Sequence, residues 1–399
     1  MTVKIVELLD VLEGKANCSD VMDDIIDTRL SALRASLVSA LATRGSHPLA
    51  EEVLESYEQL PPVNRARLLV SSEFAELVVM RLGGQATEMN EHLDPLTDDS
   101  WFVHVADCIM RESLFCDEHL AIAAKWDGER VWSPLGDRSI CEIEGTRIVD
   151  DGRRIGDVIA LDFDSPMAKR TELRSGVLSQ ARLDMSEDEK QVIQDRLQEA
   201  LSIIDELTPA YGALIRNFTR RIVLRKSTDE NPVVLANYGS EHVPRQPGSI
   251  RILNAHQKAL TIAGCMETLL HESTHNFLAA WEMGHHRFFD ESNQYRPLSP
   301  WSGNNIPNSS LAHAIFIYYA CHNLFSRYLA QPSNISPADL VHARHRRNVF
   351  GGGFMIDQPL SEQFVVTKAP AREVADIMDH MQRTIKRYHG RTVTTGVAA

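Results

Sequence analysis

The chain has 399 residues, of which 43% are hydrophobic and 24% charged, and its formal net charge at pH 7 is −14. This length exceeds one ordinary core, so we expect two domains, or one domain with a large extension. The acidic balance argues against nucleic acid or an anionic membrane surface as a partner, and no apolar run is long enough to span a membrane.

Residues 1–125 are predicted to be mainly helical. Apolar residues recur at three- and four-residue spacing in SDVMDDIIDTRLSALRASLVSALATRG and again in NRARLLVSSEFAELVVMRLGG, which is the period of an amphipathic helix. Between residues 126 and 180 the pattern changes to short alternating runs separated by Asp-Gly and Gly, which is typical of hairpin strands. We expect this small β-rich segment to bridge the two halves of the chain.

The third segment, residues 181–392, begins with a strong helix signal. Ser186 and Glu189 have the spacing of a capping box, and Pro209 follows the expected end of that helix. A second helix is expected to continue through PAYGALIRNFTRRIVL. PVVLANYG and GSIRILNA are then predicted to be strands.

A helix from Gln257 to Met283 is expected after these strands. Further helices are predicted at SLAHAIFIYYACHNLFSRYLA, SPADLVHARHRRN and AREVADIMDHMQRTIKRYH. We therefore expect an α+β fold that is predominantly helical, with a small mixed sheet packed on the helix from Gln257 to Met283.

The cysteines and the start of the chain indicate a compartment. The six cysteines are scattered and contain no CxxC pair, which is typical of reduced thiols in a cytoplasmic protein. The opening MTVKIVELLDVLEGK has acidic residues inside its apolar run, unlike a signal peptide. The sequence thus predicts a cytoplasmic protein.

The helix from Gln257 to Met283 contains HESTH, in which His271 and His275 are four residues apart. Residues at this spacing share a helix face, so both imidazoles can reach one metal ion. Glu272 lies about 100° around the helix axis and can address a ligand bound to that metal. HExxH on a helix indicates a metal site, and the alternative is a buried, hydrogen-bonded histidine pair.

The motif leaves the third ligand open. The extended zinc-protease pattern needs Gly and His where this chain has Leu278 and Trp281, so that class is excluded. Asp290 and Glu291 follow the helix and are candidates of the kind that a second protease class uses. His313, in the first turns of the next long helix, is another candidate, and a core histidine is the alternative for it.

The segment from Leu207 to Ala330 resembles the HExxH domain of bacterial peptide-modification proteins, which are encoded with ribosomally made, post-translationally modified peptides. The matching landmarks are LTPAY, GSIRIL, LLHESTH, SPW and LAHA, in this order, and they cover roughly a third of the chain. The order and spacing match better than any single motif does.

This resemblance implies a three-histidine metal site of His271, His275 and His313, with Glu272 orienting a ligand or relaying a proton. It also implies iron(II) and 2-oxoglutarate as cofactor and co-substrate, and β-hydroxylation of a side chain in a precursor peptide. Biosynthetic enzymes of the same peptide are further candidates for partners. The spacing itself shows none of this chemistry, because a histidine-rich site suits iron(II) or zinc about equally.

One departure from the family concerns 2-oxoglutarate. Many relatives read SPWR and continue with a second arginine, whereas this chain reads SPWSGNNIPNSS and lacks both. A guanidinium offers a planar fork that suits a 2-oxoglutarate carboxylate. Arg296, just upstream, is the nearest substitute, and Arg251, on the strand before the motif helix, is the next.

Three functions stay open at this point. The first is an iron(II)/2-oxoglutarate-dependent oxygenase that hydroxylates a peptide. The second is a zinc metallopeptidase with Glu272 as general base, using the same three histidines, or two of them with Glu291. The third is a non-catalytic protein that binds a peptide or a partner and contains a structural metal.

Overall fold

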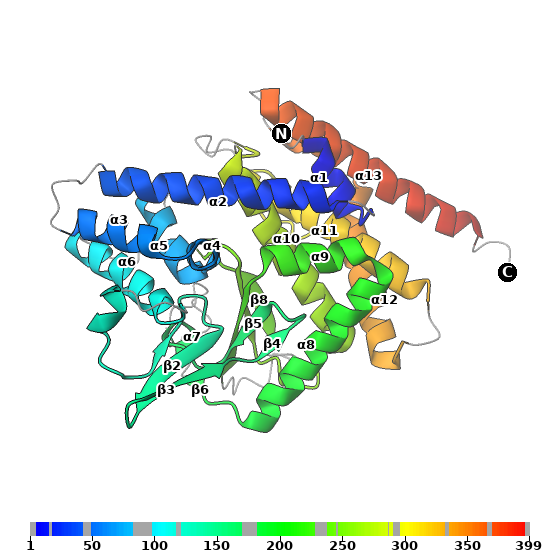
Figure 1. Ribbon diagram of the computed structural model, residues 1–399. Coiled ribbons are helices and arrows are strands. Elements are labelled where there is room, and N and C mark those ends of the chain that lie inside the picture. The colour runs from blue at the N-terminus through cyan, green and yellow to red at the C-terminus, as the bar shows by residue number, and fades with distance from the viewer. Residues whose placement is uncertain are drawn as a thin grey trace. The chain divides into compact units, whose positions relative to one another are not determined.

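The structure is a computed structural model that describes residues 5–15, 18–42, 49–82, 98–116, 121–169, 182–227, 238–244, 246–285, 287–289, 296–331, 335–364 and 369–395. It is an α+β fold that is predominantly helical, with small sheets (Figure 1). The predicted fold class is therefore confirmed.

The chain folds into two compact units, each built from separated stretches. The first unit comprises Met1–Ile26, Arg196–Asn217 and Leu260–Ala399, and the second comprises Asp27–Asp195 and Phe218–Ala259. The helices α2 (Ser19–Ala42) and α8 (Glu187–Leu207) contribute residues to both units. The predicted division into residues 1–125, 126–180 and 181–392 follows shifts in composition along the chain, and such shifts do not report a boundary inside a helix.

The first unit is helical and contains the HESTH motif. Its helices are α1 (Ile5–Leu12), α9 (Pro209–Phe218), α10 (Ile262–Gly284), α11 (Asn308–Leu329), α12 (Pro337–Gly352) and α13 (Ala369–Thr395), with short 3-10 turns at Gly353–Met355 and Leu360–Gln363. Within this unit, α10 packs against α11 and α12, and α1 packs against α11 and α13.

The second unit combines helices with the sheets. Its helices are α3 (Ala50–Gln59), α4 (Pro62–Val70), α5 (Ser72–Leu82), α6 (Asp98–Ser113) and α7 (Pro166–Lys169), with a 3-10 turn at Ala121–Lys125. The helix expected across NRARLLVSSEFAELVVMRLGG is divided at Ser71, whose extended backbone ends α4.

The strands of the second unit form a small antiparallel sheet and a larger mixed one. The strands are β1 (Val131–Trp132), β2 (Arg138–Ile143), β3 (Thr146–Asp151), β4 (Arg154–Ile155), β5 (Ile159–Asp162), β6 (Arg182–Leu183), β7 (Arg221–Ser227), β8 (Gly239–His242) and β9 (Ser249–Leu253). The first sheet has the order β1-β2-β3, and the second has the order β4-β5-β7-β9-β8, with β6 paired to β7. The β7 strand pairs in parallel with both β5 and β9, while the other pairs are antiparallel.

Local sequence signals explain two of these elements. Glu144 and Gly145 join β2 to β3 with φ angles of 52° and 76°, the left-handed conformation of a tight hairpin turn. The capping box predicted for α8 is present, because the Ser186 amide donates to Glu189 and the Glu189 amide donates to the Ser186 hydroxyl.

Two boundaries differ from the predictions. The second helix ends at Phe218 rather than continuing through RRIVL, which forms β7. Ile222 and Val223 are fully buried there between two parallel neighbours, the environment that favours β-branched residues. The motif helix begins at Ile262 rather than Gln257, because Thr261 caps it by accepting from the Gly264 amide. The strand predicted at PVVLANYG falls on residues 232–239, of which 232–237 lie outside the described residues.

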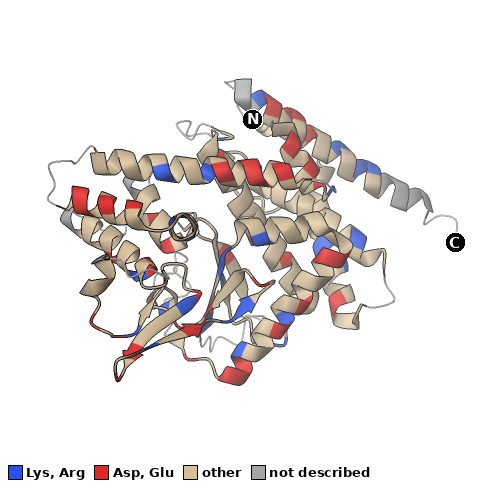
Figure 2. Ribbon diagram, viewed as in Figure 1, with Lys and Arg blue, Asp and Glu red and all other residues tan. Residues whose placement is uncertain are grey.

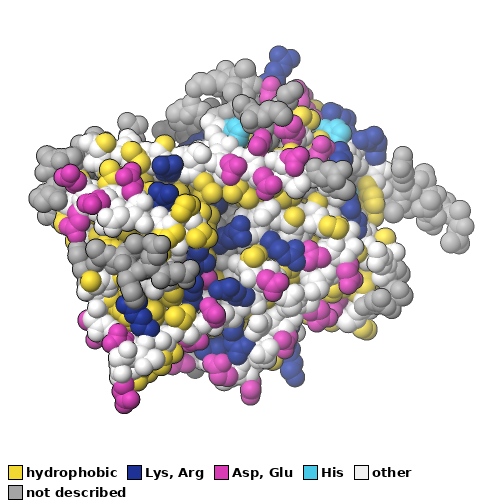
Figure 3. Space-filling model, in the orientation of Figure 1, with side chains coloured by type: hydrophobic (Ala, Val, Ile, Leu, Met, Phe, Trp, Pro, Cys, Tyr) yellow, Lys and Arg dark blue, Asp and Glu magenta, His cyan; other side chains and the backbone are white. Residues whose placement is uncertain are grey.

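The charge distribution agrees with the acidic composition. Acidic residues occur along the first half of α2 and much of α3, where Glu51 and Glu52 occupy the first turn (Figure 2). On the face in Figure 3, acidic side chains are spread among basic and hydrophobic ones. Across the described ranges, no helix has both the length and the apolar character to cross a membrane.

A pair of histidines, of which His322 is buried and His389 half-buried, joins α11 to α13 in the first unit. His322 is 1% exposed, and its Nε2 lies 3.3 Å from Nε2 of His389. Burial, together with the positive potential of His389 and Arg347, lowers the pKa of His322 to about 3. The folded protein therefore holds this imidazole neutral at pH values where an unfolded chain protonates it.

This pair predicts an acid-sensitive stability. An unfolded histidine has a pKa of about 6.5, so the contribution of neutral His322 is complete above that pH and is lost as the pH falls toward 3. Replacing His322 with Phe should reduce the pH dependence of the free energy of unfolding by up to about 1.4 kcal/mol per pH unit between pH 6 and 4. Urea unfolding at several pH values measures this difference.

The matched control is His345→Phe, at an exposed position on α12. It should leave the wild-type pH dependence unchanged. An unchanged dependence in His322→Phe as well would contradict the prediction.

Candidate metal centre

The helix that carries the motif is fixed at its start by two side-chain caps. The Thr261 hydroxyl accepts from the Gly264 amide, and the Asp339 carboxylate of α12 accepts from the Ala263 amide at 2.7 Å. Both contacts satisfy amides that a helix otherwise leaves without partners. Leu270 and Phe277 on α10 are fully buried, so the helix is also held by the core of the first unit.

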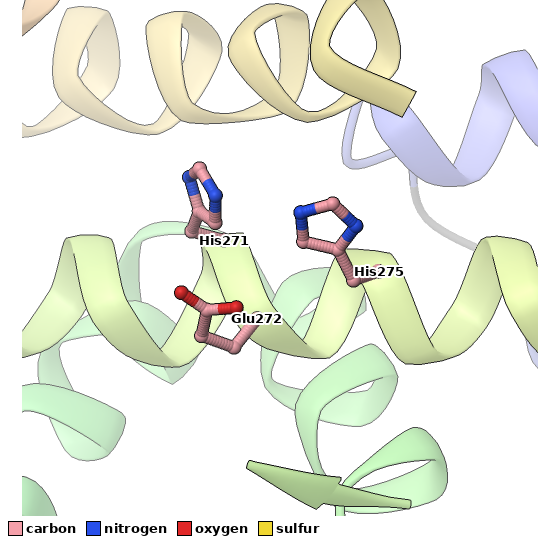
Figure 4. Close-up of side chains that lie close together, drawn as sticks. All are labelled: His271, Glu272 and His275. Carbon is pink, nitrogen blue, oxygen red and sulfur yellow. The ribbon is translucent and has the colours of Figure 1, made fainter. Parts of the chain in front are cut away.

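His271 and His275 project from the same side of α10, as their spacing predicts (Figure 4). Their ring centroids are 5.3 Å apart, and both side chains are half-buried. Glu272 leaves the helix in a different direction and is 4% exposed (Figure 4). One ligand atom from each of the three side chains lies within 4.8 Å of the others, so a metal and a carboxylate beside it fit here.

His313 on α11 approaches this pair. Its Nδ1 lies 3.3 Å from Nδ1 of His275, and the two ring centroids are 5.5 Å apart. Two imidazole nitrogens at about 2.0–2.1 Å from one metal and at a tetrahedral angle are about 3.3–3.4 Å apart. The separation therefore suits two ligands of a single ion, and a hydrogen bond between the rings is the alternative that the same distance permits.

Glu282 explains the orientation of His313. Its Oε2 lies 3.1 Å from Nε2 of His313, and its Oε1 accepts from the Phe288 amide at 2.8 Å. A carboxylate in this position accepts a hydrogen bond from Nε2–H, which leaves the Nδ1 lone pair of His313 directed toward His275. Metal-binding histidines are commonly held this way through their second nitrogen.

Two candidate ligand sets therefore share His271 and His275. Glu272 completes one set and His313 the other. In the set with His313, a carboxylate orients the added imidazole, and the nitrogen separation from His275 matches two ligands of one ion. In the set with Glu272, the three ligand atoms all lie within 4.8 Å of one another.

Glu282 was not predicted from the sequence, although its spacing from the two motif histidines indicates it. Glu282 follows His275 by seven residues and His271 by eleven, which are both close to whole numbers of helical turns. It therefore lies on the same face of α10 as the two histidines. A search for acids at these spacings finds it.

Aromatic side chains border the centre on the side of His271. The Tyr318 ring lies 5.9 Å from the His271 ring and 4.9 Å from the Trp301 indole. Burial raises the pKa of Tyr318, and the negative potentials of Cys321, Glu267 and Glu272 act in the same direction. Tyr318 therefore stays protonated and can donate a hydrogen bond.

Gly353 makes room for Trp301, which is the tryptophan of the SPW landmark. A Cβ atom added at Gly353 would lie 2.1 Å from the Trp301 ring, closer than real contacts allow. The Trp301 indole donates to the Phe350 carbonyl at 2.9 Å. The segment FGGGF, residues 350–354, thus leaves room for the tryptophan that packs on Tyr318.

Three arginines bear on the question of which guanidinium could bind a carboxylate beside this site. Arg346 on α12 donates to both oxygens of Glu267, which lies one turn before His271. Arg251 belongs to the second unit and pairs with Glu241 at 3.1 Å. Arg296 belongs to the first unit and is exposed.

The other candidates for the third ligand divide into excluded and undescribed residues. Leu278 and Trp281 are buried, and the Trp281 ring stacks on Phe288 with centroids 4.8 Å apart. These positions serve the core, as expected for a chain outside the extended zinc-protease class. Asp290 and Glu291 lie outside the described residues.

Comparison with known proteins adds no family. No protein-family model matches the chain, and no curated protein matches it. The resemblance to peptide-modification proteins therefore stays a prediction.

Glu282→Gln tests the orientation of His313. The neutral amide oxygen of Gln accepts from Nε2–H more weakly than a carboxylate, and its NH2 group can donate to Nε2 instead, so we expect the affinity for zinc or iron(II) to fall about 10- to 100-fold. Competition titration with a chromophoric chelator measures the affinity. Glu206→Gln, at an exposed position on α8, is the control and should bind metal like the wild type. Equal affinities in both variants would contradict the assigned role.

Substitutions at two neighbouring glycines test the packing of Trp301. Gly353→Ala places a methyl group against the indole, so we expect a loss of about 1–3 kcal/mol in the free energy of unfolding and a changed tryptophan emission. Gly352→Ala meets nothing within 4 Å and should leave the emission unchanged. Denaturant unfolding followed by fluorescence compares them. Identical behaviour of the two variants would refute the proposed packing.

Proposed function

We propose that this chain is a metal-dependent enzyme that modifies a ribosomally made precursor peptide. The observation that carries the proposal is the 3.3 Å separation between the facing nitrogens of His275 and His313, next to His271 and a buried Glu272. Catalytic metal sites commonly use three protein ligands and keep a further position for substrate or water. We also propose a cytoplasmic location, because the six free cysteines are scattered and none forms a CxxC pair.

The first reaction that we propose is iron(II)- and 2-oxoglutarate-dependent hydroxylation of a peptide side chain. Bound iron(II) with 2-oxoglutarate would supply dioxygen activation, and bound zinc would supply Lewis acidity toward water. His271, His275 and His313 would hold the ion, and Glu282 would keep the proton on Nε2 of His313. The support for this reaction is the order of the sequence landmarks.

Arg296 is the better of the two candidates for the distal carboxylate of 2-oxoglutarate. Its side chain is exposed and belongs to the same unit as the three histidines. The guanidinium of Arg251 already donates to Glu241. A guanidinium engaged with a carboxylate has fewer donors for a second one.

The second candidate is a zinc peptidase, and the position of Glu272 favours it. A carboxylate oxygen of Glu272 lies within 4.8 Å of ligand atoms of both motif histidines. From there it can accept the proton of an attacking water and return it to the leaving amine. Tyr318, held protonated beside His271, can donate to a substrate carbonyl.

An anaerobic titration of the metal-free protein separates these reactions. Iron(II) is added first and 2-oxoglutarate second, while visible absorbance is recorded, because bidentate 2-oxoglutarate on iron(II) gives a weak charge-transfer band. We expect the band in the wild type and in His345→Ala, and its loss in His271→Ala and His313→Ala.

Each contrary outcome has a defined meaning. If no band forms while the wild type binds zinc tightly, the hydroxylase is excluded and peptide hydrolysis with zinc is assayed next. If neither metal binds, both enzymatic proposals fail. A band that survives in His313→Ala would refute His313 as a ligand.

A further inference from the structure

A buried arginine in the second unit has two donor atoms without partners. Arg29, on α2, is 4% exposed, and in the described part of the chain its Nε and Nη2 atoms have no hydrogen-bond partner. Burial, together with the nearby charge of Arg220, lowers the pKa of Arg29 to about 10, so the guanidinium stays charged at neutral pH. A buried charge without a partner is strongly unfavourable, and proteins normally pair it.

A second arginine, Arg220, is bonded through its backbone to the turn beside which Arg29 lies. The Arg220 amide donates to the Gly248 carbonyl at 2.8 Å, and its Nε is buried without a partner. A Cβ atom placed on the same Gly248 would lie 3.7 Å from Nη2 of Arg29. Arg29 thus lies beside the turn that precedes β9, and the charge of Arg220 acts on Arg29 there.

Further polar atoms without partners lie in this turn. Gln246 lies two residues before Gly248 and Ser249 directly after it, and within the described ranges the Gln246 Oε1 and Ser249 Oγ atoms are buried without a hydrogen bond. Ser249 can donate to an oxygen atom, and Gln246 Oε1 can accept from a protonated one. Several unsatisfied groups at one place indicate a missing binding partner more strongly than one group does.

The surrounding backbone offsets only part of the charge. Carbonyl oxygens of Val70 and Phe218, the last residues of α4 and α9, lie within 3.8 Å of the same Cβ position. Helix C-termini carry partial negative charge and stabilise cations. Among the described residues, however, neither oxygen accepts from Nε or Nη2 of Arg29.

We propose that Arg29 and Arg220 bind a small oxyanion, a phosphate or carboxylate group, at the turn before β9. Guanidinium groups suit such anions because their planar donors match pairs of oxygen atoms. Ser249 would donate a further hydrogen bond, and a protonated oxygen, as in hydrogen phosphate, would satisfy Gln246. All of its residues belong to the second unit, whereas the histidines of the metal centre belong to the first.

Thermal unfolding of the full chain tests the proposal. The protein is dialysed into chloride buffer, and then about 10 mM sodium phosphate, about 10 mM sodium succinate or chloride of equal ionic strength is added. Concentrations on the millimolar scale are suited to a weak anion site. We expect phosphate, succinate or both to raise the Tm of the wild type by about 3–6 °C above the chloride control. A shift with phosphate alone assigns a phosphate group, and a shift with succinate assigns a carboxylate.

The variants decide whether the shift comes from this site. Arg29→Met and Arg220→Met should lose most of it, while Arg344→Met, at an exposed position on α12, should keep it. Arg29→Met removes a charge without a partner and should fold in chloride alone, and Arg220→Met gives an independent reading. No shift in the wild type, or equal shifts in the wild type and in both Arg29→Met and Arg220→Met, would overturn the proposal.

Discussion

The approach of His313 on α11 to His275 on α10 is the contact on which the account of this protein depends. Two histidines of one helix supply only part of a metal site, so in the proposed three-histidine site the neighbouring helix brings the third imidazole. The caps from Thr261 and Asp339 fix the start of α10 and join it to α12. The motif helix is thus held by contacts remote from its histidines, as a preorganised site requires.

The glutamates Glu267, Glu272 and Glu282 of α10 have different partners. Glu267 is occupied by His342 and Arg346, and although burial raises its pKa, these hydrogen bonds outweigh burial and lower it. Glu282 is occupied by His313 and the Phe288 amide. Glu272 is the one that lies among the ligand atoms of the motif. A 10- to 100-fold effect of Glu282 on affinity equals about 1.4–2.7 kcal/mol, small beside the roughly 10–16 kcal/mol of a tight zinc site. Glu282 thus adjusts a site that the histidines create.

Helical spacing was enough to predict the shared face of His271 and His275, and the capping box was enough to predict the start of α8. The choice of His313 came from the resemblance, because nothing local distinguishes it from a core histidine. The break between α9 and β7 was missed because RRIVL is short and apolar, which suits a buried strand as well as a helix. The approach of Arg29 to Arg220 is a long-range contact, and no sequence pattern reports it. Residue spacing thus predicts which side chains share one face of a helix, while contacts between elements depend on the fold.

The most direct test of the central claim is X-ray absorption spectroscopy of the metal-loaded protein. Imidazole rings give multiple-scattering features from which the number of histidine ligands is counted. The account predicts three imidazoles on the metal in the wild type and two in His313→Ala, with His285→Ala keeping three. Two imidazoles in the wild type, with an unchanged spectrum in His313→Ala, would contradict it and would leave Glu272 as the candidate for the third ligand.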